Sequence, residues 1–150
     1  MIEIATQSVS YENCNFESLK EPGLGLFDSD YFDFVISLLV VQHIDPSAAL
    51  LYVGELFRIL KPGGVLVLQI PHAPDWTPKG IRLRLVRSLP DSIRRALRKA
   101  SNRPETMLMY GMKESRLLNI AAENGATCAS VERTLTNGWQ DRQYIFKRFS

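Results

Sequence analysis

The sequence has few of the side chains that build disulfide scaffolds and metal centres. Its two cysteines, Cys14 and Cys128, lie far apart and share no metal-ligand spacing, and its two histidines have no acids at such spacing. No disulfide framework and no metal site are therefore predicted. Two reduced thiols in a cytoplasmic protein are the favoured interpretation.

Long apolar runs are also missing. No segment approaches the roughly 20 apolar residues of a membrane span, and the N-terminus has no basic region followed by an apolar one, as a signal peptide has. Neither a Gly-x-Ser-x-Gly nucleophile motif nor a phosphate-loop sequence occurs. The length of 150 residues is expected to form one domain with a real core.

Positive charge is concentrated in one segment. Between Lys79 and Arg103 lie nine basic residues and one acid, Asp91, whereas the rest of the chain holds nine basic and fifteen acidic residues. The net charge of +2 therefore does not imply a basic surface over the whole protein, and a nucleic-acid partner is not favoured. The segment belongs to a predicted basic helical insertion at about residues 72–106.

The first half of a central unit is a strand followed by a helix. Val35–Val41 is a nearly unbroken apolar run rich in β-branched residues, which is typical of a strand buried on both faces. Asp45 then offers a side-chain oxygen to cap a helix that begins at Pro46. One face of this helix is apolar: Ala49, Val53, Leu56, Phe57 and Leu60.

The second half of this unit is another strand. The helix is expected to end at a turn formed by Pro62-Gly63-Gly64, and the apolar run Val65–Ile70 follows, ended by Pro71. Strand, helix and strand with short connections form a βαβ unit. The predicted fold class is therefore α/β, with helices on both faces of the sheet.

The segments on either side are less clearly patterned. Met1–Ser8 is a candidate helix end, and Asn13–Phe16 is a candidate short strand. The periodicity of Ile81–Leu89 fits either a strand or a helix. Asp91 is a candidate N-cap for an amphipathic helix over Ile93–Ala100.

The C-terminal part of the chain predicts a helix and a hairpin. An amphipathic helix after Gly111 is expected to close at Gly125. Strands are predicted over Thr127–Thr134 and Arg142–Phe149, and the Asn137-Gly138 dipeptide between them favours an antiparallel hairpin.

The central unit, FDFVIS…VVQHI…ELFRILKPGGVLVLQIP, resembles the second half of a class I S-adenosylmethionine-dependent methyltransferase. In that family a strand opening with Phe-Asp-x-Val precedes a helix ending in Arg-x-Leu-Lys-Pro-Gly-Gly and another strand. The resemblance is clearest over Phe27–Pro71 and extends more loosely over Met107–Arg148. It implies a Rossmann-like sheet, mostly parallel with an antiparallel C-terminal strand, and S-adenosylmethionine as the cofactor.

Two parts of the family's cofactor site are absent from the sequence. These are a glycine-rich turn after the first strand and an acid at the end of the second; Gly23-x-Gly25 is the nearest match, but it opens no helix. The N-terminal strands of the sheet are thus predicted to be missing, which leaves Val35–Val41 as an exposed edge. Truncation is favoured, and the alternatives are a partner protein on the edge or pairing by Asn13–Phe16.

The resemblance places cofactor contacts at the end of the first predicted strand. It implies that Ser37, Leu38 and Leu39 line the methionine portion of the cofactor, with plain core packing as the alternative. It also implies that Glu21 lies near the acid that reaches the adenine, although an ordinary solvated turn carboxylate is the other interpretation.

Two histidines and a tryptophan are the candidates for chemistry on the acceptor. His43, between strand and helix, is the candidate catalytic base, because imidazole takes up a proton near neutral pH. A helix-entry residue satisfied by the backbone is the alternative role. His72 and Trp76 follow the second strand and are candidate substrate contacts.

The expected function is methyl transfer to oxygen or nitrogen of a small-molecule, sugar or lipid acceptor. No Asn-Pro-Pro-aromatic motif or Pro-Cys nucleophile occurs, which argues against methylation of base amines or cytosine C5. The alternative is a non-catalytic remnant or interaction module that binds a protein partner or an anionic surface. The basic segment is a candidate lid over the acceptor, a peripheral membrane contact, a phosphate contact or a solvated helix face.

Overall fold

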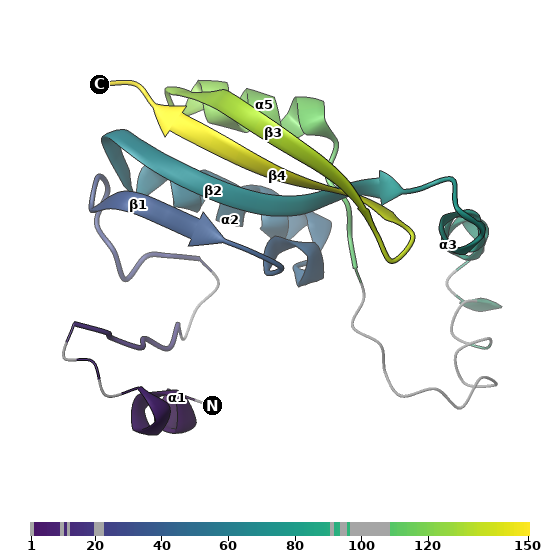
Figure 1. Cartoon of the computed structure of the whole chain (residues 1–150), viewed down its shortest axis with the longest axis horizontal. Coiled ribbons are helices and arrows are strands. Elements are labelled where there is room, and N and C mark those ends of the chain that lie inside the picture. Colours follow the sequence, from purple (N-terminus) through teal and green to yellow (C-terminus); the bar gives the residue numbers. More distant parts are fainter. Residues whose placement is uncertain are drawn as a thin grey trace.

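The computed structural model describes residues 2–9, 11, 13–19, 23–90, 92, 93, 96 and 109–150 (Figure 1). The elements in chain order are α1 (Ile2–Ser8), β1 (Phe32–Ser37), the 3-10 turn η1 (Val41–His43), α2 (Pro46–Arg58), β2 (Leu60–Pro74), α3 (Pro78–Ser88), α5 (Glu114–Glu123), β3 (Ala126–Thr136) and β4 (Trp139–Arg148). Helix α1 confirms the predicted N-terminal helix, and it lies apart from the sheet.

The sheet has the strand order β1-β2-β4-β3. Strand β1 pairs with β2 in parallel, and β4 runs antiparallel to both β2 and β3. Three of the four strands therefore point the same way and β4 opposes them, as the sequence predicts. The carboxyl ends of β1, β2 and β3 consequently lie toward the same edge of the sheet.

Helix α2 begins as predicted but ends earlier. The Asp45 side chain accepts a hydrogen bond from the amide of Ser47 at 3.0 Å, and Pro46 is the first helical residue. The helix ends at Arg58, before the Pro62-Gly63-Gly64 turn that was expected to stop it. Amides of the chain entering β1 bond to the carbonyls of Arg58 and Ile59 and satisfy that helix end.

The Pro-Gly-Gly turn instead lies inside the first part of β2. The pairing with β1 jumps from Phe32 opposite Leu60 to Phe34 opposite Val65, so the intervening residues bulge out of the ladder. Gly63 has φ of 79°, a left-handed conformation that glycine adopts without strain.

The predicted strand limits also need correction. Strand β1 covers Phe32–Ser37 and not Val35–Val41, because Leu39 adopts φ of 60° and turns the backbone out of the extended conformation. Strand β2 continues past Pro71 to Pro74, since β4 pairs with it there across a register shift that accommodates the proline. Asn13–Phe16 forms no strand and is exposed, so that prediction is wrong.

Helices α2 and α5 pack on the same face of the sheet (Figure 1). The strand residues buried beneath them are Leu66, Leu68, Ile70, Tyr144 and Phe146. The Phe57 and Phe146 rings meet edge to face with centroids 5.2 Å apart.

The opposite face and the β1 edge are open in the described chain. Phe34 and Ile36 point to that face and are 54% and 56% exposed. The prediction of helices on both faces is therefore wrong for the described residues. The predicted exposed edge is confirmed, and Asn13–Phe16 does not cover it.

The remaining predictions concern the C-terminal half. Ile81–Leu89 lies mostly in helix α3, and Gly125 follows α5 with φ of 67°. Asn137 and Gly138 form a two-residue turn with φ of 54° and 88°, so the predicted hairpin is confirmed. Asp91 and most of Ile93–Ala100 lie outside the described residues.

Arg58 fastens the loop before β1 to the end of α2. Its guanidinium donates to both carboxylate oxygens of Glu55 at 2.8 Å each, and to the carbonyls of Leu24 and Phe27 at 3.1 and 3.0 Å. The hydrogen bond from Arg58 lowers the pKa of the Glu55 carboxyl below its ordinary value. The ionised carboxylate therefore stabilises the fold above that ordinary value, and the stabilisation is lost as the pH falls through the lowered pKa.

Replacing Glu55 by Gln should reduce stability in a pH-dependent way. We expect the free energy of unfolding to fall by about 0.5–1 kcal/mol at pH 7 because a half-buried ion pair is lost. The difference should shrink toward zero at a pH below the lowered pKa of Glu55, because the wild-type carboxyl is then protonated. Urea unfolding at both pH values measures this, with the exposed Glu132→Gln as control. An equal deficit at both pH values would contradict the account.

Candidate functional site

Strand β1 delivers Ser37 to the carboxyl edge of the sheet. Ser37 is 4% exposed, and its Oγ has no hydrogen-bond partner among the described residues. It stands opposite Leu68 on the helix-covered face. Buried hydroxyls in native structures almost always have a partner, so this one marks a place where a polar partner is required.

The backbone after Ser37 is strained. Leu39 has φ of 60°, which costs a non-glycine residue of order 1 kcal/mol or more. The turn exposes three apolar side chains in succession: Leu38 at 41%, Leu39 at 56% and Val40 at 45%. An exposed apolar lip on a strained turn at the end of a parallel strand is a typical ligand-binding arrangement.

His43 lies in η1, immediately beyond this lip. Its Nε2 lies 3.1 Å from the Nε2 of Gln42, whose side chain is buried. An amide nitrogen only donates, so the His43 Nε2 accepts this hydrogen bond. The main chain of Gln42 is also tied down, because its carbonyl accepts from the amide of Tyr110 at 2.7 Å.

His72 lies near the end of β2 and is oriented by the segment before α5. Its Nδ1 is 3.3 Å from the carbonyl oxygen of Met112, which can only accept. The amide of Met112 in turn donates to the carbonyl of Pro71 at 2.8 Å. The proton of a neutral His72 therefore resides on Nδ1, and its Nε2 keeps a lone pair.

Residues 109–113 thus join the two histidine-bearing segments, and sequence reasoning did not identify them. Gly111 packs so closely on the end of β2 that a Cβ there would lie 2.9 Å from the carbonyl carbon of His72. Gly111 is the sequence feature that indicates this contact, since a glycine outside a turn motif suits a close approach of two backbone segments.

Trp76 lies farther along, beyond the end of β2. It is 74% exposed, and the Arg84 guanidinium lies 4.2 Å from its ring centroid. Strand β1 stops pairing at Leu68 of β2, so Trp76 lies on the hairpin side of the edge and away from the lip. Glu21, the predicted adenine contact, lies outside the described residues.

The start of α3 is locked onto the β3–β4 hairpin. Asp75 is buried and accepts from the Thr77 amide at 2.9 Å, while its own amide donates to the Gly138 carbonyl at 2.8 Å. The Thr77 hydroxyl caps the helix by accepting from the Gly80 amide at 3.2 Å. Gly80 is the contact residue, because a Cβ there would overlap Asp75.

A family model described as a methyltransferase domain matches residues 1–68. The predicted resemblance to class I S-adenosylmethionine-dependent methyltransferases is confirmed by this match and by the fold. A search of curated protein sequences finds no significant match.

This chain has the fold of several solved structures that are distant from it in sequence. A SAM-dependent methyltransferase from Methanosarcina mazei is 20% identical, with a TM-score of 0.60 over 98% of this chain and 75% of its own. Magnesium protoporphyrin IX methyltransferase from Synechocystis PCC 6803, solved with bound S-adenosylhomocysteine, is 23% identical, with a TM-score of 0.53 over 79% of this chain.

A third structure with this fold was solved with two bound small molecules. The 1,6-didemethyltoxoflavin-N1-methyltransferase of Burkholderia thailandensis, with bound 1,6-didemethyltoxoflavin and S-adenosylhomocysteine, is 12% identical at a TM-score of 0.50 over 81% of this chain. The present chain spans 45% of the Synechocystis protein and 46% of the Burkholderia protein. At these identities the likeness establishes the fold alone.

Replacing Gly80 by Ala should separate α3 from the hairpin. We expect the free energy of unfolding to fall by about 1–3 kcal/mol, because the new methyl group overlaps the backbone of Asp75. Intrinsic fluorescence and urea unfolding measure it, since Trp76 and Trp139 both lie at this end.

Gly54→Ala is the matched control for that substitution. A Cβ at Gly54 meets nothing within 4 Å, and the residue lies within α2, so alanine should stabilise the protein by about 0.5–1 kcal/mol. Equal behaviour of the two variants would show that α3 is not locked as described.

Proposed function

We propose that this chain forms the methionine side and the acceptor side of an S-adenosylmethionine-dependent methyltransferase site. The observation that best supports it is the unpartnered buried hydroxyl of Ser37 beside the strained turn at Leu39. Both lie where open α/β sheets bind ligands, beyond the carboxyl end of a parallel strand. The family match over residues 1–68 supports the same assignment.

The described residues fit one part of this cofactor. Ser37, Leu38 and Leu39 would hold its methionine portion, the hydroxyl as a hydrogen-bonding group and the leucines as apolar walls. Glu21 stays the candidate for the adenine. The sequence has no glycine-rich turn of the kind that the family uses to approach the cofactor, so we assign that backbone contact to no residue of this chain. When bound, S-adenosylmethionine supplies the electrophilic methyl group.

We assign the acceptor side to the two histidines, with different roles. The Met112 carbonyl holds the Nδ1 proton of His72, which leaves Nε2 to take a proton from an acceptor hydroxyl or amine. The Nε2 of His43, the base expected from the sequence, already accepts from Gln42, so we give His43 a positioning role. The rest of the contribution of the protein is proximity and orientation. Proposed acceptors are small molecules, sugars or lipids, with Trp76 at the periphery.

Replacing Ser37 by Ala distinguishes this role from core packing. We expect unchanged or slightly higher stability, because a buried hydroxyl without a partner is removed. We also expect S-adenosylhomocysteine to bind roughly 3–10-fold more weakly, the value of one hydrogen bond. Calorimetric titration measures the affinity, and the exposed Ser130→Ala is the control.

Two results would contradict the proposal. Equal affinity in wild type and Ser37→Ala would remove Ser37 from the site. No binding by the wild type would favour the alternative of a non-catalytic module, for which the exposed Phe34 and Ile36 beside the open β1 edge are the supporting observation. A partner protein would then be the expected ligand of that edge.

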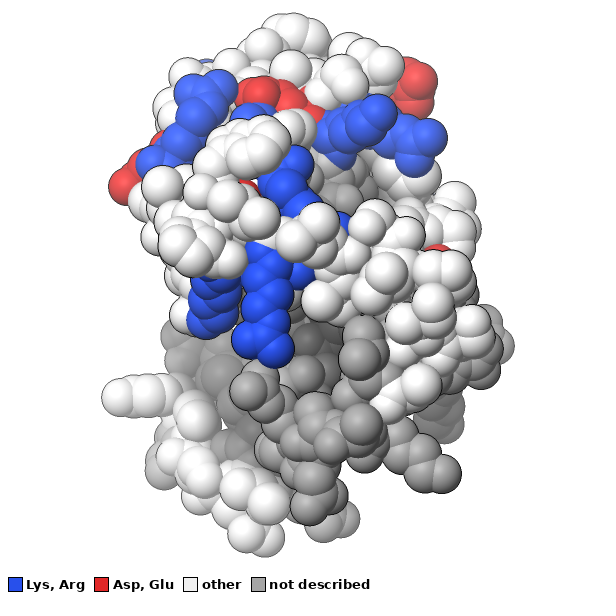
Figure 2. Space-filling model, turned by 90° about the vertical axis from the view of Figure 1, so that its right-hand side faces the viewer, with Lys and Arg blue, Asp and Glu red and all other residues white. Residues whose placement is uncertain are grey.

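The exposed side of α3 supports a second candidate role, contact with an anionic membrane. Ile81 and Leu85 are 42% and 64% exposed there, next to the exposed indole of Trp76. Figure 2 looks onto this end of the molecule and shows Lys and Arg side chains among mainly uncharged ones. Cations around exposed apolar and indole groups are the composition of an interfacial helix. No helix in the described part of the chain has the length and apolar character to cross a bilayer.

Vesicle flotation tests the membrane contact. We expect the chain to float with phosphatidylglycerol-containing vesicles and not with phosphatidylcholine alone, because the cations require anionic headgroups. Leu85→Ser should reduce flotation several-fold, whereas Leu118→Ser, an exposed leucine of α5, should not. Equal flotation with both lipids, or with neither, would rule out this contact.

A further inference from the structure

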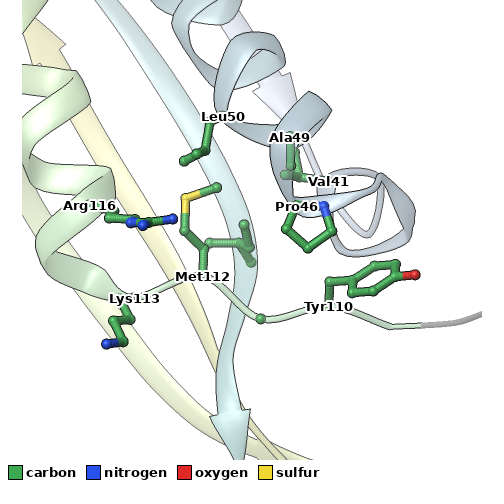
Figure 3. Close-up of a pocket in the computed structure, with 10 residues that line it drawn as sticks. Val41, Pro46, Ala49, Leu50, Tyr110, Met112, Lys113 and Arg116 are labelled. Atoms are coloured by element: carbon green, nitrogen blue, oxygen red, sulfur yellow. The ribbon is translucent and has the colours of Figure 1, made fainter. Parts of the chain in front are cut away.

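A separate cavity lies between the start of α2 and the segment that leads into α5. Figure 3 shows this cavity, which has a volume of about 270 Å³. Its lining residues are Val41, Pro46, Ala49, Leu50, Ile70, Tyr110, Gly111, Met112, Lys113 and Arg116. Most of these are apolar, and the volume equals that of about nine water-sized groups. The cavity therefore suits a small apolar body.

The charged side chains of the lining are both cations, Lys113 and Arg116. In Figure 3 the guanidinium of Arg116 points toward the side chain of Met112, whereas the Lys113 ammonium points away. Neither cation has an ion pair with an acid in the described part of the chain. Arg116 is therefore placed to bind an anionic group at the mouth of an apolar cavity.

The nearby carboxylates are already occupied. Glu114, adjacent in sequence to Lys113, bonds instead to Arg142 and, at 3.3 Å, to Arg133. Asp45 caps α2 by accepting from the amide of Ser47, which puts a negative charge at the start of that helix. The Asp45 carboxylate offsets the positive end of the α2 dipole, so the attraction for an anion in the cavity comes from the Arg116 side.

We propose that this cavity binds a medium-chain carboxylate, with its carboxylate on Arg116 and its alkyl chain between Leu50 and Met112. Apolar walls supply burial, and one cation supplies orientation, which is the usual composition of a small-molecule site. The site is distinct from the methyl-transfer site proposed above, since Ser37, His43 and His72 do not line it. The two share Met112, whose side chain lines the cavity and whose carbonyl orients His72.

The test is a titration of the intact chain with octanoate, followed by amide chemical shifts, against the neutral octanol as matched ligand. We expect octanoate to bind with a Kd on the order of 1 mM or tighter for a ligand of this size. Octanol should bind at least about tenfold more weakly, because it cannot form the charge-assisted hydrogen bond. Shifts should concentrate at residues 110–116 and at the start of α2.

Variants assign the anion to its residue. Arg116→Gln should weaken octanoate binding about tenfold or more, whereas Arg116→Lys should keep most of it. Arg82→Gln, on the exposed side of α3, removes the same charge away from the cavity and should change nothing. Binding unaffected by Arg116→Gln, equal binding of octanol, or no octanoate binding by about 10 mM would overturn the proposal. None of these results involves the cofactor, so the proposed function is tested separately.

Discussion

The structure depends on β2, which forms the only parallel pairing among the described strands, with β1, and also pairs antiparallel with β4. Its inward residues Leu66 and Leu68 are fully buried beneath α2 and α5. Each Å² of apolar surface removed from water contributes about 25 cal/mol to the free energy of unfolding. This buried layer is therefore the main source of stability. Because β2 extends beyond β1, it also places His72 and the α3 helix at the edge where the candidate site residues lie.

Much of this fold could be predicted from the sequence, where local chemistry decides the outcome. Asp45 and Pro46 determine where α2 begins, and Asn137 with Gly138 determines the hairpin. The errors arose where tertiary pairing overrides local pattern. Pro71 would end an isolated strand, but β4 continues the ladder past it. Apolar residues continue through Leu39, but the backbone turns there and exposes them.

The candidate site was predictable only in outline. The carboxyl end of β1 and the two histidines could be located from their order in the chain and from the family resemblance. The partners of those histidines could not, because Met112 lies 40 residues from His72 and no periodicity links them. The unpartnered state of the Ser37 hydroxyl likewise depends on the packing around it, which no single-sequence pattern encodes.

The central claim is that the cofactor binds at the carboxyl end of β1, beside the end of β2 that carries His72. Amide chemical-shift mapping of the isotope-labelled chain with S-adenosylhomocysteine tests it most directly. The account predicts shifts concentrated at residues 37–43 and 70–72, with the amides of β3 unmoved. Shifts confined to α5 and β3, or no shifts at saturating ligand, would contradict it.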